Sequence, residues 1–247
     1  MQPILLEIAT FSLQGAIDAA IAGAHRIELC ENAGAGGTTP SFGMLKQAPK
    51  QVSIPIFPII RPRGGDFIYS NAEFQIICDD VICCRELGYL GIVVGMLTEH
   101  GQVNKKQLEK VMELAGPMEV TFHRAFDRTA EPLTALEEII DAGCQRILTS
   151  GQYPSCVNGL ELIKTLVQQA NQRIIIMPGS GLNSSNVRQI LNESGAFECH
   201  TAARETIHSE YHSPISMNES LTYTGVDSNE IKSILSEIRQ VESERTL

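Results

Sequence analysis

The amino-acid sequence predicts a single (β/α)8 TIM-like barrel over residues 1–247. In four places a helix-like stretch stops at a glycine and an apolar, strand-like run follows, at Gly23, Gly88, Gly143 and Gly195. Glycine suits the left-handed position that ends a helix, and a continuous apolar run suits a strand buried on both faces. The length of 247 residues also fits one barrel. An open doubly wound sheet is the alternative.

Eight segments have the apolar and β-branched composition of buried strands. They span residues 4–8, 26–30, 55–60, 91–94, 119–123, 146–149, 173–177 and 197–200. Strands that alternate with helices form a parallel sheet covered by those helices. Eight such units without a long extra run of strands favour closure into a barrel.

Helical signals fill the gaps between these strands. Ser70 and Glu73 form a capping box, and apolar residues follow them at helical spacing. Pro132 stands near the first turn of another helix. A last helix is expected over about 227–243, whereas the segment at about 205–226 lacks a core pattern and is expected to be an irregular loop. The apolar stripe of the last helix consists of Ile231, Ile234, Leu235 and Ile238.

Charge and composition limit the classes of binding partner that we expect. The formal net charge is −10, and no run of lysine and arginine of motif length occurs. Such a surface repels nucleic acid and anionic membranes, so neither is an expected partner. No run of about 18 apolar residues suggests a membrane span.

The cysteines and the N-terminus predict a cytoplasmic protein. Seven cysteines occur, with no C-x-x-C pair, and we expect them to be reduced thiols. The N-terminal stretch has no basic region and carries Glu7 early, which is unlike a signal peptide.

Polar residues gather where the predicted strands end. In barrels of this class, chemistry occurs at the C-terminal ends of the strands, so we expect a functional pocket there. The candidate catalytic residues are His123, Glu7, Glu28 and Asp127. The candidate anion-binding residues are Arg61, Arg63, Asp66, Arg124, Ser150, Gly151, Gly179, Ser180, Gly181, His200 and Arg204.

His123 is the candidate general acid and base, with its pKa tuned by Glu7 or Glu28. The alternative is structural: the two glutamates pair with Arg61 or Arg124 in a buried network, and His123 is a core histidine with its hydrogen bonds satisfied. Both interpretations stay open at this point.

Arginines near the strand ends suit carboxylate or phosphate groups. Arg61, Arg63 and Arg124 are the candidates for this role. Asp66 or Asp127 would orient an arginine or bind a divalent metal, and the alternative for Asp127 is a cap on the following helix.

A glycine-rich loop follows the seventh predicted strand in the sequence "PGSGLNSSN". Its backbone N–H groups and the positive end of the next helix suit an anion, and phosphate sites in barrels often use the loops after strands 7 and 8. Arg204 would add a guanidinium group. The alternative is an ordinary turn.

Several of these motifs together resemble the copper homeostasis (CutC) family. They are "RIELC" (26–30), "GGTTPS" (36–41), "IPIFPIIRPRGGDFIYS" (54–70), "VTFHRAFD" (120–127), "RILTSGQ" (146–152) and "MPGSGL" (177–182). The resemblance implies a TIM-like barrel, a cytoplasmic setting and a part in copper tolerance or trafficking. Copper binding is attributed to members of this family, and by position Cys30 is the candidate Cu(I) ligand.

The cysteine pattern does not supply an evident second copper ligand. Cu(I) favours thiolate and thioether ligands, usually at least two. Cys199 points away from whatever His200 faces if the strand alternates, and Cys78 and Cys84 lie on an apolar helical face. A copper site shared between two chains of a homodimer is a further alternative for Cys30.

Three functions therefore stay open. The first is a copper-binding homeostasis protein. The second is a barrel enzyme with acid/base chemistry, of lyase, isomerase or hydrolase type, acting on a small phosphorylated or carboxylated metabolite. The third is a scaffold in which the polar strand ends form only a structural network.

Overall fold

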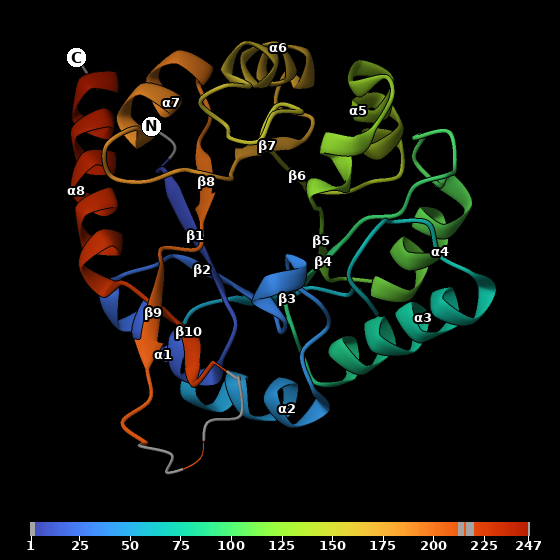
Figure 1. Ribbon diagram of the computed structural model, residues 1–247. Helices are drawn as coiled ribbons and strands as arrows, with labels where there is room; N and C mark the ends of the chain where they lie inside the picture. Colours follow the sequence, from blue (N-terminus) through green and yellow to red (C-terminus); the bar gives the residue numbers. More distant parts are fainter. Residues whose placement is uncertain (1–2, 212–214, 216–219, 247) are drawn as a thin grey trace.

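Eight short parallel strands form the wall of a barrel, and helices surround it (Figure 1). The computed structural model describes residues 3–211, 215 and 220–246. The strands are β1 (Leu5–Thr10), β2 (Arg26–Leu29), β3 (Ile56–Pro58), β4 (Gly91–Val94), β5 (Glu119–Phe122), β6 (Arg146–Thr149), β7 (Ile175–Pro178) and β8 (Glu198–Thr201). Each lies within or next to a predicted strand, and the predicted (β/α)8 TIM-like barrel is confirmed.

The wall consists of two four-stranded halves. One has the order β3-β2-β1-β8 and the other the order β4-β5-β6-β7. An isolated parallel bridge between Ile59 and Val93 joins the β3 end to the β4 end, and β7 lies beside β8 on the opposite side. The C-terminal ends of all eight strands consequently meet at one mouth.

The helices begin and end at the signals in the sequence. They are α1 (Leu13–Ala22), α2 (Phe42–Gln51), α3 (Asn71–Glu86), α4 (Lys105–Ala115), α5 (Pro132–Asp141), α6 (Leu160–Ala170), α7 (Val187–Ser194) and α8 (Ser228–Arg245). The capping box of Ser70 and Glu73 is present at the start of α3. The four junction glycines all have the positive φ expected of a helix end, at 103°, 80°, 90° and 74° along the chain.

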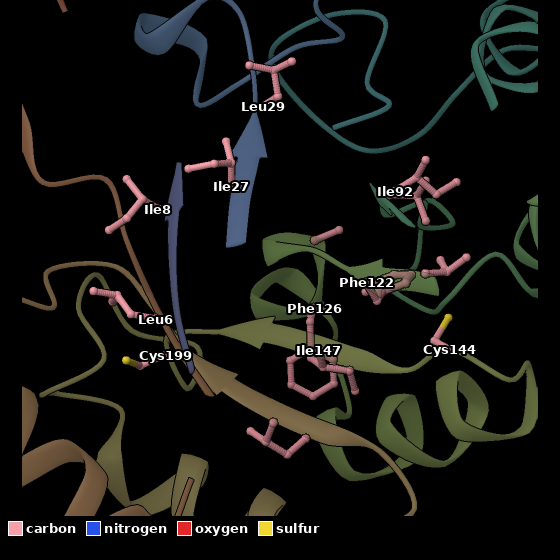
Figure 2. Packing of buried hydrophobic residues seen from close by; sticks show 14 of the residues in the cluster. Leu6, Ile8, Ile27, Leu29, Ile92, Phe122, Phe126, Cys144, Ile147 and Cys199 are labelled. Carbon is pink, nitrogen blue, oxygen red and sulfur yellow. The ribbon is translucent and has the colours of Figure 1, made fainter. Parts of the chain in front are cut away.

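The apolar core lies between the strands and the helices (Figure 2). On β2, Ile27 and Leu29 belong to this core, whereas Arg26 and Glu28 alternate with them and point into the barrel. On β8, Cys199 belongs to the same core. The prediction that it points away from the side reached by His200 is therefore confirmed.

The segment after β8 departs from the prediction. Instead of an irregular loop at about 205–226, β9 (Arg204–His208) and β10 (Thr222–Val226) form an antiparallel hairpin. The residues of β9 are mostly exposed, so its sequence "RETIH" carries no core pattern that would reveal a strand. The middle of the expected loop, 212–214 and 216–219, lies outside the described residues.

The predicted C-terminal helix is present as α8. Asp227 caps it by accepting hydrogen bonds from the N–H groups of Asn229 and Glu230, and it ends at Arg245, two residues beyond the expected end. All four residues of its predicted apolar stripe are buried. Among the helices of the described residues, none is long and apolar enough to cross a membrane.

Candidate functional site

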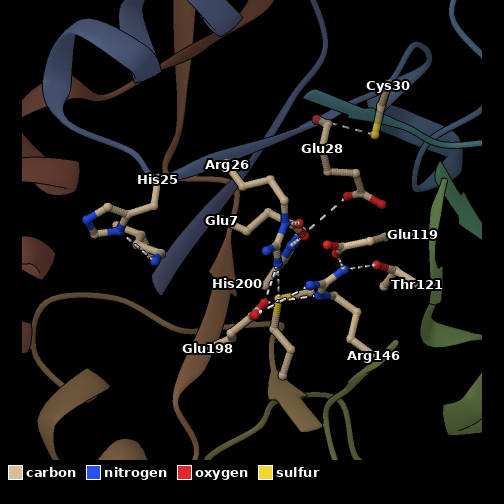
Figure 3. Close-up of polar contacts among 12 residues, drawn as sticks. Glu7, His25, Arg26, Glu28, Cys30, Glu119, Thr121, Arg146, Glu198 and His200 are labelled. Atoms are coloured by element: carbon tan, nitrogen blue, oxygen red, sulfur yellow. Dashed lines mark hydrogen bonds and ion pairs between the residues drawn. The ribbon is translucent and has the colours of Figure 1, made fainter. Parts of the chain in front are cut away.

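Buried charged side chains fill the middle of the barrel (Figure 3). This interior charge cluster consists of Glu7, Arg26, Arg146, Glu198 and His200. Strand register assembles it, because Glu7 on β1 is paired with Arg26 on β2 and with His200 on β8. Side chains at paired positions point to the same face of a sheet, so these three groups meet inside the barrel.

Arg26 connects two carboxylates of the interior charge cluster. Its Nε donates to Glu7, and its Nη2 donates to Glu198. Arg146 adds a second hydrogen bond to Glu198, from Nε to Oε2 at 3.1 Å. Burial alone would lower the pKa of Arg26, but the two carboxylates outweigh it and raise that pKa. Buried charges that are paired and hydrogen-bonded in this way avoid most of the penalty of desolvation.

Two glutamates flank the imidazole of His200. The Nδ1 atom lies 2.8 Å from Oε1 of Glu7, and the Nε2 atom lies 3.7 Å from Oε2 of Glu28. Burial alone would raise the pKa of Glu7, but Arg26 and His200 outweigh it and lower that pKa to about 2. Glu7 is thus ionised and accepts a hydrogen bond from the Nδ1–H group of His200, which leaves Nε2 to face Glu28.

Glu28 has the opposite titration behaviour. Burial raises its pKa to about 7, although His200 works against the shift. For His200, burial alone would lower the pKa, but the hydrogen bond to Glu7 and the charge of Glu28 raise it. Glu28 therefore changes protonation close to neutral pH, while Glu7 on the other side of His200 stays ionised.

The partners of the two glutamates differ from the structural alternative considered for the sequence. That alternative paired Glu7 and Glu28 with Arg61 or Arg124, but their partners are Arg26 and His200. For Glu7 the difference arises because β3 and β5 are not neighbours of β1. For Glu28 on β2, which does pair with β3, it arises because the Arg61 guanidinium donates to backbone carbonyl groups instead.

Arg61 instead holds the glycine-rich loop after β2. Its Nη1 donates to the carbonyl oxygens of Ala35 and Gly37 at 2.8 and 2.9 Å, and its Nη2 donates to that of Gly65 at 2.8 Å. The guanidinium is buried, and its carbon lies 4.8 Å from the centre of the Phe67 ring. Arg61 thereby fixes this loop at the mouth and keeps its own positive charge beside it.

A cavity of about 610 Å³ lies at this mouth. Both the Glu28 and His200 side chains line it, so the carboxyl group of Glu28 and its imidazole partner are at its wall. The predicted site residues among its lining are Glu28, Arg61, His123, Arg124, Ser180, Gly181, His200 and Arg204. Glu7 lies behind His200, in the interior charge cluster.

His123 is buried and neutral at the cavity wall. Its Nδ1 accepts a hydrogen bond from the N–H of Ala125 at 3.1 Å. Burial, together with the nearby charge of Arg61, lowers its pKa to about 3. The ring consequently does not titrate near neutral pH, unlike the general acid and base expected from the sequence.

Gly95 at the end of β4 makes room for the His123 ring. A Cβ on Gly95 would lie 2.3 Å from both Cε1 and Nδ1 of that ring. We expect Gly95→Ala to lower the free energy of unfolding by about 1 to 3 kcal/mol, because the ring must shift in a packed interior. Urea denaturation measures this loss.

Gly43→Ala is the matched control for that substitution. Gly43 lies exposed in α2, and a Cβ added there would lie 4.0 Å from Oγ of Ser41. Alanine there should stabilise the protein slightly through helix propensity. Equal responses at the two positions would contradict the close packing of His123.

A second polar network holds Arg124 in place. The buried carboxylate of Asp127 accepts from Arg124 Nε at 2.7 Å, and it also accepts from the N–H of Ser150 at 3.0 Å. The other guanidinium nitrogens of Arg124 donate to Ser180 Oγ at 3.1 Å and to Ser150 Oγ at 2.8 Å. Asp127 therefore orients Arg124. The N-cap position of α5 is occupied by Glu131, which makes no side-chain capping hydrogen bond, and not by Asp127.

The loop after β7 has an unusual backbone. Ser180 has a φ of 77° and Gly181 a φ of 72°, and both line the cavity. A serine in the left-handed region is strained, and such residues gather at functional sites. The hydroxyl of Ser180 accepts from Arg124 and lies 2.9 Å from the carbonyl oxygen of Pro154.

Some predicted site residues serve packing. A Cβ on Gly151 would lie 2.2 Å from the carbonyl oxygen of Gly159, so this glycine allows two loops to approach. A Cβ on Gly179 would lie 2.6 Å from Leu148 and 3.2 Å from the His200 ring. Gly179 thus supports the position of His200 from behind.

Arg63 and Asp66 lie outside the lining of the cavity, contrary to the expectation that they bind an anion there. Arg63 pairs with Asp66 at 3.0 Å and with Glu73 at 2.5 Å, and all three groups are partly or largely exposed. The chain after β3 turns outward toward the start of α3, which carries Glu73. These ion pairs connect the chain after β3 to the first turn of α3.

Cys30 does not lie in a setting that suits Cu(I). Its thiol is buried in a small apolar cluster with Phe57, Ile59 and Val93. Burial raises its pKa well above the ordinary value, and the charge of Glu28 adds to the rise, so the thiolate that binds copper is disfavoured. Over the described part of the chain, no group of three or more His, Cys, Asp and Glu side chains is placed to hold a metal ion.

Several residues of the site were not anticipated from the sequence. Arg26, Arg146 and Glu198 stand at the beginnings of their strands, whereas the prediction considered only strand ends. In "RIEL" and "ECHT" the signal was present as charged or polar side chains at alternate positions, whereas "RILT" carries only a single arginine at its start. The cavity is also lined by Asp227 and Glu230 at the start of α8, far along the chain from the strand ends.

Comparison with known proteins agrees with the resemblance. Residues 4–205 match the model of the CutC family. A CutC family protein of Chromobacterium violaceum is 48% identical over 200 residues, which cover 81% of each chain. The human copper homeostasis protein cutC homolog is 45% identical over 202 residues, covering 82% of this chain and 74% of the human one.

A solved structure supports the same assignment. The CutC structure from Streptococcus agalactiae superposes with a TM-score of 0.77 at 32% sequence identity, covering 81% of this chain and 98% of that one. With the family model matching well over half of its residues, this chain belongs to the CutC family.

Proposed function

We propose that this protein is an acid/base enzyme that acts on a small anionic metabolite, with Glu28 and His200 exchanging the proton. The observation that carries the proposal is the buried row Glu7–His200–Glu28, in which His200 and Glu28 line a cavity of about 610 Å³. A carboxyl group that burial brings to a pKa of about 7 both accepts and releases a proton at neutral pH.

Each residue of the row has a separate task. Glu28 takes the proton from the substrate. The Nε2 atom of His200 lies 3.7 Å from Oε2 of Glu28 and is the partner of this carboxylate. Glu7 stays ionised and fixes the orientation and tautomer of His200 through the 2.8 Å contact to Nδ1. The general acid and base of this proposal is therefore Glu28 with His200, in place of His123.

The positive groups at the mouth support an anionic substrate. Arg124 is half-exposed and is oriented by the buried carboxylate of Asp127. Arg204 is exposed at the cavity and lies 4.6 Å from the ring of Phe11. A phosphate or carboxylate bound between them would receive charge-assisted hydrogen bonds.

Proton exchange with solvent tests this function. The protein is incubated in D2O at pH 7 with phosphorylated and carboxylated metabolites, and NMR follows deuterium entering each compound. We expect at least one compound to exchange or convert, and Glu28→Gln to slow this by about 100-fold or more.

Glu205→Gln is the control for the same chemical change. Glu205 is exposed on β9, next to Arg204, and its substitution should leave the exchange rate unchanged. Exchange that persists at the wild-type rate in Glu28→Gln would refute the assignment of the proton to Glu28.

A role in copper homeostasis is suggested by the name of the human relative. The thiol of Cys30 is buried among apolar side chains, and these surroundings do not support Cys30 as a Cu(I) ligand. We expect Cys30→Ala to bind as much Cu(I) as the wild type in an anaerobic competition with a chromophoric chelator. Loss of one equivalent of copper in Cys30→Ala would show that this expectation is wrong.

The remaining expectations from the sequence stay proposals. All seven cysteines are free and six are buried, which fits a reducing, cytoplasmic setting. Neither nucleic acid nor membrane is proposed as a partner, given the net charge of −10. A homodimer stays open, and sedimentation would decide it.

A further inference from the structure

We propose that the Nε2–H group of His123 donates a hydrogen bond to a carbonyl oxygen of the substrate, so that the substrate is a small aldehyde, ketone or keto acid carrying an anionic group. This inference deepens the proposed function and rests on it for the base, Glu28. It adds the class of the substrate and a role for His123 that differs from proton transfer.

The hydrogen bond from Ala125 fixes the tautomer of His123. Its N–H points at Nδ1 at 3.1 Å, so Nδ1 acts as the acceptor and has no proton. In a neutral imidazole the proton must then be on Nε2. The low pKa of the ring keeps this form at all ordinary pH values.

The Nε2–H group lacks a partner in the described part of the chain. The Nε2 atom is buried, yet no hydrogen-bond acceptor accompanies it there. A buried donor without an acceptor is costly, and native proteins rarely keep one without a reason. Because His123 lines the cavity, a ligand oxygen in the cavity would satisfy this donor.

Protein groups occupy other sides of the ring, and the buried Nε2 atom is the ring nitrogen left without a partner in the described part of the chain. Gly95 and Ala125 cover the edge formed by Cε1 and Nδ1, since a Cβ on Gly95 would touch both atoms. Phe67 covers one face, with ring centres 4.9 Å apart. The guanidinium carbon of Arg61 lies 4.8 Å from the centre of the Phe67 ring, which adds positive charge near the donor.

The two groups at the cavity wall suit the removal of a proton next to a carbonyl. Ionised Glu28 takes a proton from the carbon beside the carbonyl, and the C–H electron pair becomes the C=C bond of an enolate. The π pair of the carbonyl moves onto oxygen, where the His123 donor stabilises the negative charge. After the proton on Glu28 exchanges with solvent, its return to the same carbon restores the carbonyl compound, which gives deuterium exchange without an oxidant or reductant.

A neutral imidazole suits this task because it supplies an N–H donor without requiring a positive charge to be buried. A donor that is already placed and shielded from water needs no reorganisation when charge develops on the oxygen. The ring is neutral because burial and the positive charge of Arg61 both disfavour a cationic imidazole at this position.

NMR of the wild-type protein with labelled histidine tests the donor directly. The probes are oxalate and phosphoglycolohydroxamate, which resemble an enolate and an enediolate, and inorganic phosphate is the control. We expect both analogues to move the Nε2–H resonance of His123 downfield. A resonance that neither analogue moves would overturn the inference.

Binding to variants supplies the second measurement. We expect His123→Phe, which keeps a ring without a donor, to bind both analogues about 10- to 100-fold more weakly. His123→Gln, whose amide can donate, should lose less, and phosphate should bind all three proteins alike. Equal affinity of His123→Phe and wild type for the analogues would also overturn the inference.

The outcomes separate this inference from the proposed function. If deuterium exchange depends on Glu28 but His123→Phe binds the analogues normally, the carbonyl donor is wrong and the acid/base function stands. If the analogues engage His123 but Glu28→Gln exchanges at the wild-type rate, the carbonyl site stands and the assignment of the base fails.

Discussion

Replacing Arg26 with methionine is expected to lower the free energy of unfolding by about 3 to 5 kcal/mol. Arg26 lies between Glu7 and Glu198, and all three side chains are buried. Methionine would keep much of the volume but leave Glu7 with His200 as its remaining ion-pair partner. Removing one partner of a buried pair leaves an uncompensated charge, which explains the size of the loss. Urea denaturation at pH 7, followed by circular dichroism, measures it.

Arg173→Met is the control for a surface ion pair. Arg173 and Glu137 pair at 2.7 Å, but their side chains are 44% and 39% exposed. Such pairs contribute about 0 to 1 kcal/mol, so this variant should unfold almost like the wild type. Similar small losses in both variants would show that the interior charge cluster does not carry the stability inferred for it.

Arg26→Met should also change how the stability of the protein responds to acid. Because Glu7 has its pKa lowered from 4.5 to about 2, its ionised form contributes stability above about pH 4.5 that is lost as the pH falls toward 2. Without Arg26 the main cause of that lowering is gone. Arg26→Met should therefore lose less of its remaining stability than the wild type between pH 4.5 and 2.

The barrel was predictable because local patterns determine its elements. Glycines at the helix ends and apolar strands repeat along the chain, and each repeat describes one βα unit without reference to the others. The hairpin of β9 and β10 was missed for the same reason. Its strands are largely exposed, so burial leaves no trace in the order of apolar and polar residues.

The site was only partly predictable because it depends on register and on the path of loops. Knowing that strands end at one mouth was enough to place Glu28, Arg124 and His200 around a common cavity. It was not enough to show that His200 lies between two glutamates, which follows from β1 and β8 being neighbours. It also could not show that the turn carrying Arg63 leads outward to Glu73.

Glu28→Gln is expected to stabilise the protein at alkaline pH while it removes the proposed activity. The pKa of Glu28 is raised from 4.5 to about 7, so the stability associated with its protonated form is fully present below about pH 4.5. That stability is lost as the pH rises through 7, because the buried carboxylate must then ionise. Glutamine is neutral at every pH and avoids this loss.

The difference between the two proteins should therefore depend on pH in one direction. At pH 4.5 wild type and Glu28→Gln should unfold at similar urea concentrations, and by pH 8 the variant should be more stable by up to about 3 kcal/mol. Titrations of both proteins between these pH values measure the difference. A variant that is less stable than wild type across the whole range would show that Glu28 is a structural member of the network.

The sign of this result bears on function more than its size. A side chain kept only for stability should not weaken the fold when it is ionised, and replacing it with its neutral isostere should not help. Glu28 is buried where ionisation is unfavourable, next to His200 and at the wall of a cavity. If Glu28→Gln gains stability at pH 8 and loses proton exchange, the carboxyl group is retained against the stability of the fold, which is the behaviour of a catalytic residue rather than of a scaffold.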